Sequence, residues 1–214
     1  MEPLLPNLET AFLLFDYAAV LVFGASGALA AARRGHDIVT FAFFAAMTGV
    51  GGGTLRDLLI GAPVFWINSP GYLLACITAA IVVWLVGRRT WRMSALLWLD
   101  AIGMAAYCIV GAAKALSLGV HPVSAVVMGM MTACFGGVLR DVVAGEPSIL
   151  LQREIYVTAT ILGAAVFVVL AALGGDRIVA GVVGFGCAFA LRGAAIHWKL
   201  GLPGFDGREP PEEA

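Results

Sequence analysis

Charged residues are scarce in this sequence, and neither sign predominates. Asp, Glu, Lys and Arg make up only 13% of the 214 residues, and the formal net charge is -1. A soluble domain is about 25% charged, so this composition excludes a soluble globular fold. Nucleic acid is also excluded as a partner, because no basic stripe is present that could follow a phosphate backbone.

Residue types that bind metals or act as nucleophiles are equally few. The three histidines lie near separate ends of apolar segments, and the motifs HExxH, CxxC and GxSxG are absent. The four cysteines lie inside apolar segments: Cys76, Cys108, Cys134 and Cys187. We therefore expect no metal site, no cofactor and no enzymatic activity.

Long apolar stretches are what the sequence does contain, and 61% of its residues are hydrophobic. A helix of about 20 residues crosses the hydrocarbon core of a bilayer, which is about 30 Å thick. The predicted spans are residues 11–31, 38–59, 72–86, 93–113, 120–143, 155–173 and 178–196. The sequence thus predicts an all-α integral membrane protein, with seven transmembrane helices in one domain over residues 1–198. Residues 199–214 are Pro-rich and acidic, which predicts a short disordered cytoplasmic tail.

The basic residues between spans predict the orientation of the bundle, because Arg and Lys near span ends stay in the cytoplasm. Those assigned to the cytoplasmic side are Arg33, Arg34, Arg88, Arg89, Arg92, Arg153, Lys199 and Arg208. The opposite side holds mainly Arg177, together with the acidic Glu2 and Glu9. We therefore expect the N-terminus outside and the C-terminus in the cytoplasm.

The two halves of the chain resemble each other at a constant separation of 84 residues. The matches include Asp16 with Asp100, Arg56-Asp57 with Arg140-Asp141, Pro63 with Pro147 and Tyr72 with Tyr156. Each copy holds three spans, and an odd number makes the second copy enter the membrane from the other side. The sequence predicts two inverted three-helix repeats, residues 11–87 and 95–171, plus an extra helix at 176–198. Inverted repeats are typical of proteins that move solutes across membranes.

Glycine runs occupy the middle of the second span of each repeat, in MTGVGGGTLRDLLIG and MTACFGGVLRDVVAG. Gly51, Gly52 and Gly53 in one span, and Gly136 and Gly137 in the other, predict a bend or local unwinding. Backbone groups freed in this way cannot face lipid, so they must be buried in protein or line water. The alternative is that these small residues let two helices pack closely.

Charged residues lie beside these glycines and need partners, because each costs about 2.5–3.5 kcal/mol at the centre of a span. Neighbours in sequence diverge on a helix, so we expect Arg56 and Asp57 to be poor partners. The inverted topology instead predicts two ion pairs, Asp16 with Arg56 and Asp100 with Arg140. These pairs either join the helices or line a permeation path.

Three further charges are candidates for a role in permeation. Asp57 and Asp141 are candidates for attracting a cation to each mouth of the path. Lys114 has no counterpart in the first repeat, where Ala30 stands at the equivalent position. Its side chain either snorkels to the outer surface or places a positive charge that senses voltage or blocks a pore.

The motifs GGGTLRDLLIG and FGGVLRDVVAG, the seven spans and the repeat resemble prokaryotic members of the trimeric intracellular cation channel family. The resemblance implies a homotrimer in a bacterial inner membrane, in contact with membrane lipid, with one pore per protomer beside the second and fifth spans. It also implies passage of monovalent cations, chiefly potassium. The five glycines match the family's kink glycines, and Lys114 lies in the span where animal members carry basic residues tied to gating. Thr54-Leu55-Arg56 replaces the animal KEV motif, so phosphoinositide regulation is not expected.

Bacterial proteins with the same paired glycine motif also resemble a glycine transporter family. A channel needs a continuous wet path, whereas a carrier needs an occluded site. Few side-chain donors converge to bind a carboxylate and an amine, which favours the channel. A helix N-terminus after either glycine run could nevertheless receive a substrate carboxylate, so the carrier stays open as the alternative.

Overall fold

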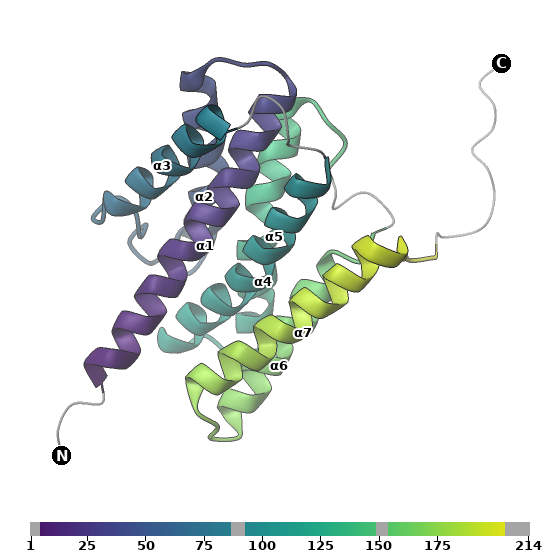
Figure 1. Cartoon of the computed structure of the whole chain (residues 1–214). Coiled ribbons are helices and arrows are strands. Elements are labelled where there is room, and N and C mark those ends of the chain that lie inside the picture. Colours follow the sequence, from purple (N-terminus) through teal and green to yellow (C-terminus); the bar gives the residue numbers. More distant parts are fainter. Residues whose placement is uncertain (1–4, 87–92, 149–153, 204–214) are drawn as a thin grey trace.

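The computed structural model describes residues 5–86, 93–148 and 154–203, and within these ranges the chain forms seven helices (Figure 1). They are α1 (Leu5–Arg33), α2 (Ile38–Leu59), α3 (Gly71–Val86), α4 (Met93–Ser117), α5 (Pro122–Ala144), α6 (Val157–Ala172) and α7 (Arg177–Trp198). The predicted order of spans is confirmed, although α1 begins before its predicted start and α4 continues beyond its predicted end. Most of the predicted disordered tail, and several of the basic residues used to predict orientation, lie outside the described residues.

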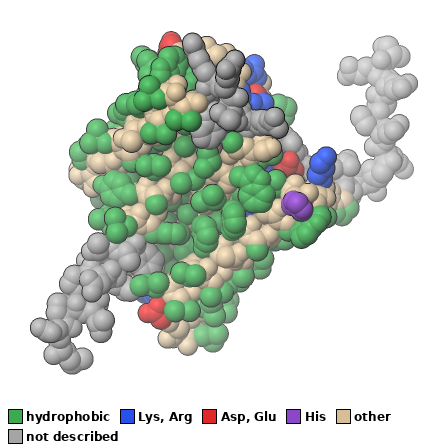
Figure 2. Space-filling model, viewed as in Figure 1, with side chains coloured by type: hydrophobic (Ala, Val, Ile, Leu, Met, Phe, Trp, Pro, Cys, Tyr) green, Lys and Arg blue, Asp and Glu red, His purple; other side chains and the backbone are tan. Residues whose placement is uncertain are grey.

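Five of these helices, α1, α2, α4, α5 and α7, are long and apolar enough to cross a membrane. The other two, α3 and α6, are apolar but have 16 residues each. Large hydrophobic side chains remain exposed on the molecule, including Val39, Leu85 and Leu173. Hydrophobic atoms cover the middle of the face seen in Figure 2, and charged atoms lie toward its edges. So much exposed apolar surface fits lipid and not water, and the chain is a membrane protein.

Local sequence signals explain where several helices begin and end. Asp37 precedes α2 and Asp176 precedes α7, and each carboxylate accepts a hydrogen bond from a backbone N–H in the first turn of its helix. Gly61 and Gly145 turn the chain after α2 and α5 with φ angles of 68° and 65°. These two glycines are 84 residues apart, so equivalent turns end the equivalent helices.

The helices pack in two similar groups around a central crossing (Figure 1). α1 packs against α2 and α3, and α4 packs in the same way against α5 and α6. α2 and α5 contact each other between the groups, and α7 covers α4 and α6. The largest buried apolar side chains include Phe23 of α1, Met104 and Ile109 of α4, and Phe167 of α6. The core therefore lies along α1 and α4, on both sides of the α2–α5 crossing.

Of the predicted bend or local unwinding at the glycines, the unwinding is wrong, because α2 and α5 are uninterrupted helices through Gly51–Gly53 and Gly136–Gly137; the bend stays a prediction. The space that a side chain would fill is taken by the neighbouring helix. A Cβ atom on Gly52 would overlap the carbonyl oxygen of Thr132, and one on Gly136 would overlap that of Thr48. The missing side chains thus permit backbone contact between α2 and α5, which is the close packing considered as the alternative.

Candidate functional site

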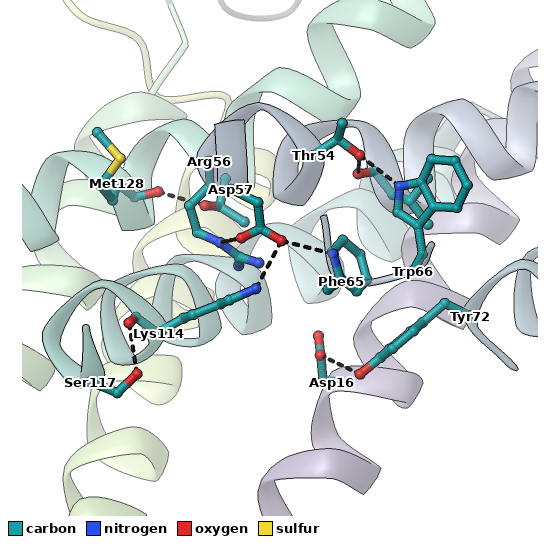
Figure 3. A network of polar contacts seen from close by, with 12 residues as sticks. Asp16, Thr54, Arg56, Asp57, Phe65, Trp66, Tyr72, Lys114, Ser117 and Met128 are labelled. Carbon is teal, nitrogen blue, oxygen red and sulfur yellow. Dashed lines mark hydrogen bonds and ion pairs between the residues drawn. The ribbon is translucent and has the colours of Figure 1, made fainter. Parts of the chain in front are cut away.

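Asp57, near the end of α2, is the centre of one buried polar cluster (Figure 3). Its Oδ1 atom accepts a hydrogen bond from Arg56 Nε at 2.8 Å, and its Oδ2 atom lies 2.8 Å from Lys114 Nζ. The backbone N–H of Phe65 also donates to Oδ2, at 3.0 Å. The carboxylate thereby joins α2, the end of α4 and the segment between α2 and α3.

This cluster corrects three of the sequence-based predictions. Arg56 and Asp57 do pair, because the long Arg side chain folds back to its neighbour although the two Cβ atoms diverge. Asp57 is fully buried between two cations, so its carboxylate is not open to attract a cation at a mouth. Lys114 turns inward to Asp57 instead of snorkelling to the surface, and its side chain is 29% exposed.

Asp16 of α1 does not form the predicted ion pair with Arg56 among the contacts of the described residues. Its Oδ2 atom instead accepts a hydrogen bond from Tyr72 OH at 2.8 Å (Figure 3). The Tyr72 ring is stacked on Tyr17, with centroids 4.2 Å apart. A neutral donor from α3 therefore occupies the place expected for the guanidinium.

Arg140 of α5 is the centre of the second buried cluster. Its Nη1 atom lies 2.5 Å from Asp100 Oδ1 of α4, which confirms the predicted contact between these two residues. Its Nε atom lies 2.9 Å from Asp141 Oδ1, and Nη1 also donates to Ser26 Oγ of α1 at 3.2 Å. Asp141 is thus paired in the same way as Asp57, and is not an open cation attractor.

A small pocket adjoins this second cluster and lies beside several buried polar atoms. The pocket is lined by Cys134, Gly137, Val138, Arg140, Asp141, Ser148 and Tyr156. Among the described residues, the buried atoms beside it without a close hydrogen bond are Asp100 Oδ2, Arg140 Nη2 and Tyr156 OH, although the Tyr156 hydroxyl and the Asp100 carboxylate do interact. A Cβ on Gly137 would lie 3.3 Å from Tyr156 OH and 3.6 Å from both Arg140 Nη2 and Asp100 Oδ1. Gly137 therefore leaves these polar groups uncovered. Gly136 has a different role, because it permits the backbone contact with Thr48.

Arg192 of α7 is a functional candidate that the sequence analysis missed. Its side chain is 1% exposed, and its Nη2 atom lies 2.6 Å from Glu154 Oε2. Its guanidinium carbon lies 5.1 Å from the centroid of the Tyr156 ring. A charge inside an apolar segment indicates a functional or paired residue, and that signal could have identified Arg192.

Within the described ranges, no group of three or more His, Cys, Asp and Glu side chains is placed to hold a metal ion. The four cysteines are free thiols, and three of them are buried. The chemistry of the two clusters is therefore that of paired charges and hydroxyl groups packed between helices.

Replacing Lys114 with methionine is expected to lower the melting temperature in detergent. The buried Asp57 carboxylate would keep Arg56 but lose a charged hydrogen bond, which contributes about 1.5–3 kcal/mol. Lys199→Met, at the exposed end of α7, serves as the control. Equal melting temperatures for the two variants would show that the Lys114–Asp57 pair adds no stability.

Comparisons with known proteins agree on the family. The model of a family described as glycine transporter matches the chain twice, at residues 13–88 and 97–172. A UPF0126 membrane protein of Vibrio cholerae is 37% identical over 204 residues, which cover 92% of this chain and 84% of the relative. The UPF0126 inner membrane protein YadS of Escherichia coli K12 is 34% identical over 194 residues, covering 89% and 94%.

Solved structures are similar along nearly the whole chain. A TRIC trimeric intracellular cation channel orthologue from Rhodobacter sphaeroides has a TM-score of 0.86 and 45% identity, and the match covers 89% of this chain and all of that one. A prokaryotic TRIC channel crystallised in 0.5 M KCl has a TM-score of 0.84 and 26% identity, covering 89% and 98%. These relatives are channels and not enzymes. The chain therefore belongs to the family that the glycine transporter model describes, as a prokaryotic member of the trimeric intracellular cation channel family.

Proposed function

We propose that this protein is a monovalent cation channel, with potassium as its chief ion and one pore per protomer beside α2 and α5. The observation that carries the proposal is the pair of buried charge clusters at the ends of α2 and α5, in a fold shared with the Rhodobacter sphaeroides channel orthologue. Buried ionisable groups inside membrane helices are costly, and they commonly mark ion pathways.

The pathway in this proposal runs between two inverted three-helix repeats, residues 11–87 and 95–171, with the helix at 176–198 as an addition. The contacts at the α2–α5 crossing support a two-fold relation between the repeats. Gly52 meets Thr132 and Gly136 meets Thr48, and these are the same contact with the two repeats exchanged, since equivalent residues are 84 apart.

Contacts between helix ends support the inversion. The Lys114–Asp57 pair joins the C-terminal ends of α4 and α2. The exposed pair between Arg33 and Glu146 joins the C-terminal end of α1 to the turn after α5. Since α1 and α2 are consecutive and packed together, α4 runs opposite to α1. The orientation in this proposal, with the N-terminus outside and the C-terminus in the cytoplasm, is supported by the basic residues near span ends.

The pore in this proposal is lined by the glycine helices and by the charged residues around them. The candidates are Gly51, Gly52, Gly53, Gly136, Gly137, Asp16, Arg56, Asp57, Asp100, Arg140 and Asp141, with Lys114 as the gating candidate. Because the carboxylates of Asp57 and Asp141 are paired, conduction requires these clusters to rearrange. The active form is a homotrimer in contact with membrane lipid, as the trimeric relatives imply.

A glycine transporter is the second candidate, and one observation favours it. In the part of the chain that the structure describes, Arg140 Nη2 and Asp100 Oδ2 are buried beside Gly137 without a close hydrogen bond. A guanidinium donor and a carboxylate acceptor are the groups that would bind the carboxylate and the ammonium of an amino acid. This carrier would use the second cluster as its occluded site.

Reconstitution of the purified protein in planar lipid bilayers tests the proposed function. We expect unitary potassium currents that persist when glycine is absent. Saturable uptake of labelled glycine into proteoliposomes, without such currents, would instead establish the carrier. Chemical crosslinking in mild detergent provides a separate test of assembly, in which a trimer band is expected and a dominant dimer band contradicts the proposal.

A further inference from the structure

A tyrosine of α4 donates a hydrogen bond to the backbone of α2. Tyr107 is buried, and its hydroxyl group donates to the carbonyl oxygen of Gly49, two residues before the run Gly51–Gly53. In an uninterrupted helix the same carbonyl accepts from the N–H of the fourth residue onward, which is Gly53. A carbonyl oxygen has two lone pairs and can accept both bonds. The Gly49 carbonyl therefore has a second donor, which comes from another helix.

The glycine helix of the second repeat, α5, has no such donor at the equivalent place. The equivalent of Tyr107 is Phe23, 84 positions earlier, and the equivalent of Gly49 is Ala133. The ring of Phe23 lies against α5, because a Cβ on Gly136 would be 2.7 Å from its Cε1 atom. Phenylalanine has no hydroxyl group, and among the described residues no side chain donates to the Ala133 carbonyl oxygen. The two glycine helices thus differ by one hydroxyl group, which serves α2.

The extra donor lowers the cost of bending α2. Bending a helix at its glycines opens backbone hydrogen bonds, and a freed carbonyl inside a membrane must find another partner. If the bond from Gly53 N–H opens, the Gly49 carbonyl keeps the bond from Tyr107. The Ala133 carbonyl of α5 would be left unsatisfied, which is unfavourable for a buried acceptor. The freed N–H group is a cost common to both helices, so α2 is the easier of the two to bend.

Contacts on either side of the glycines indicate which part of α2 moves. Before the glycines α2 is bound by Tyr107, and after them by Lys114, whose Nζ atom lies 2.8 Å from Asp57 Oδ2. Both partners lie on α4, seven residues apart, and therefore on one face of that helix. Lys114 is partly exposed, whereas Tyr107 is buried. Tyr107 is thus the fixed point, and the end of α2 beyond the glycines is the part that moves.

We propose that Tyr107 is a positioning residue for a hinge in α2. Its hydroxyl group holds the Gly49 carbonyl while the bond from Gly53 N–H opens, so α2 bends in preference to α5. The two repeats then differ in motion although their glycine helices are similar in sequence. The statement that this bend admits ions rests on the proposed function. The bend itself does not, and it is measured first without any transport.

Hydrogen–deuterium exchange of the full chain in detergent measures opening of the hinge. Mass spectrometry follows the peptides that contain Gly53 and its equivalent, Gly137. We expect Tyr107→Phe to slow exchange at Gly53 about fivefold or more, because the opened state loses the donor to its carbonyl. Exchange at Gly137 should stay the same and serves as the internal reference. A hydroxyl group that only tied two helices together would have the opposite effect, since its loss would make Gly53 exchange faster.

Tyr72→Phe is the matched control, since it removes a tyrosine hydrogen bond between α3 and α1 that does not involve α2. We expect no slowing at Gly53 in this variant. Unchanged or faster exchange at Gly53 in Tyr107→Phe would overturn the proposal, as would equal slowing at Gly53 and Gly137 or slowing in the control. If opening is too rare to measure, both variants are compared in the Lys114→Met background, which releases the end of α2. Absence of exchange at Gly53 in that background would also overturn the hinge.

Ion flux in proteoliposomes then tests the link to function. We expect Tyr107→Phe to lower potassium flux by a factor similar to the slowing of exchange at Gly53. Absence of flux from the unmodified protein would refute the channel and leave the exchange result intact. Normal flux in Tyr107→Phe, together with slowed exchange, would refute the link between the bend and conduction.

Discussion

Gly52→Ala is expected to force α2 and α5 apart and to lower the stability of the protein. The added methyl group would overlap the carbonyl oxygen of Thr132, and a helix backbone cannot rotate away as a side chain can. Overpacking of this kind costs typically about 1–3 kcal/mol and occasionally more. Replacing glycine by alanine inside a helix recovers up to about 1 kcal/mol, so a net loss remains.

Gly51→Ala, one residue away, is the matched control. A Cβ there would lie 2.8 Å from Leu139 Cδ1, which is the end of a flexible side chain that can move. We expect this variant to be neutral or slightly stabilised in thermal unfolding measured in the same detergent. If both alanine variants melt at the same temperature, the backbone contact at Gly52 does not hold the two helices together.

Arg140→Gln is expected to have the largest effect of any single charge removal. It would leave Asp100 buried without its cation, and breaking a buried pair by removing one partner costs about 3–5 kcal/mol. Arg33→Gln is the control, since Arg33 also pairs with an acidic residue, Glu146, but is 31% exposed. Pairs exposed to solvent contribute about 0–1 kcal/mol.

A double-mutant cycle with Asp100→Asn shows whether the loss belongs to this pair. Free energies of unfolding are compared for both single variants and for Arg140→Gln combined with Asp100→Asn. Residues in contact are coupled by about 0.5–3 kcal/mol, so the double variant should lose less than the sum of the singles. If the losses of the two single variants simply add up in the double variant, Arg140 stabilises the protein through Asp141 or Ser26 and not through Asp100.

The sequence predicts the helices and their order well, and it predicts the polar contacts unevenly. Asp100 and Arg140 could be paired from their cost in a membrane and from the repeat. The same reasoning is wrong for Asp16 and Arg56, because it ignores the neutral donor Tyr72. Both repeats carry the tyrosine, so the same residues at equivalent positions can make different contacts in the two repeats.

Lys114 and the glycines show a second limit. Lys114 reaches Asp57 because α2 and α4 end beside each other, and that proximity depends on tertiary packing that the pattern of one helix does not contain. The glycine runs identify where α2 and α5 lack side chains. Close helix packing and helix bending both favour glycine, so the sequence alone does not tell them apart. The position of the neighbouring carbonyl groups, which only the structure gives, shows the close packing.

The shortness of α6 has a consequence for the lipid around the protein. Its 16 residues, bounded by Tyr156 and Leu173, span about 24 Å at 1.5 Å per residue, less than a hydrocarbon core of about 30 Å. Hydrophobic mismatch of this kind is relieved when the bilayer becomes thinner beside the helix. A thinner bilayer would shorten the apolar barrier next to the second cluster, so we expect the stability of the protein to depend on the acyl chain length of the surrounding lipid.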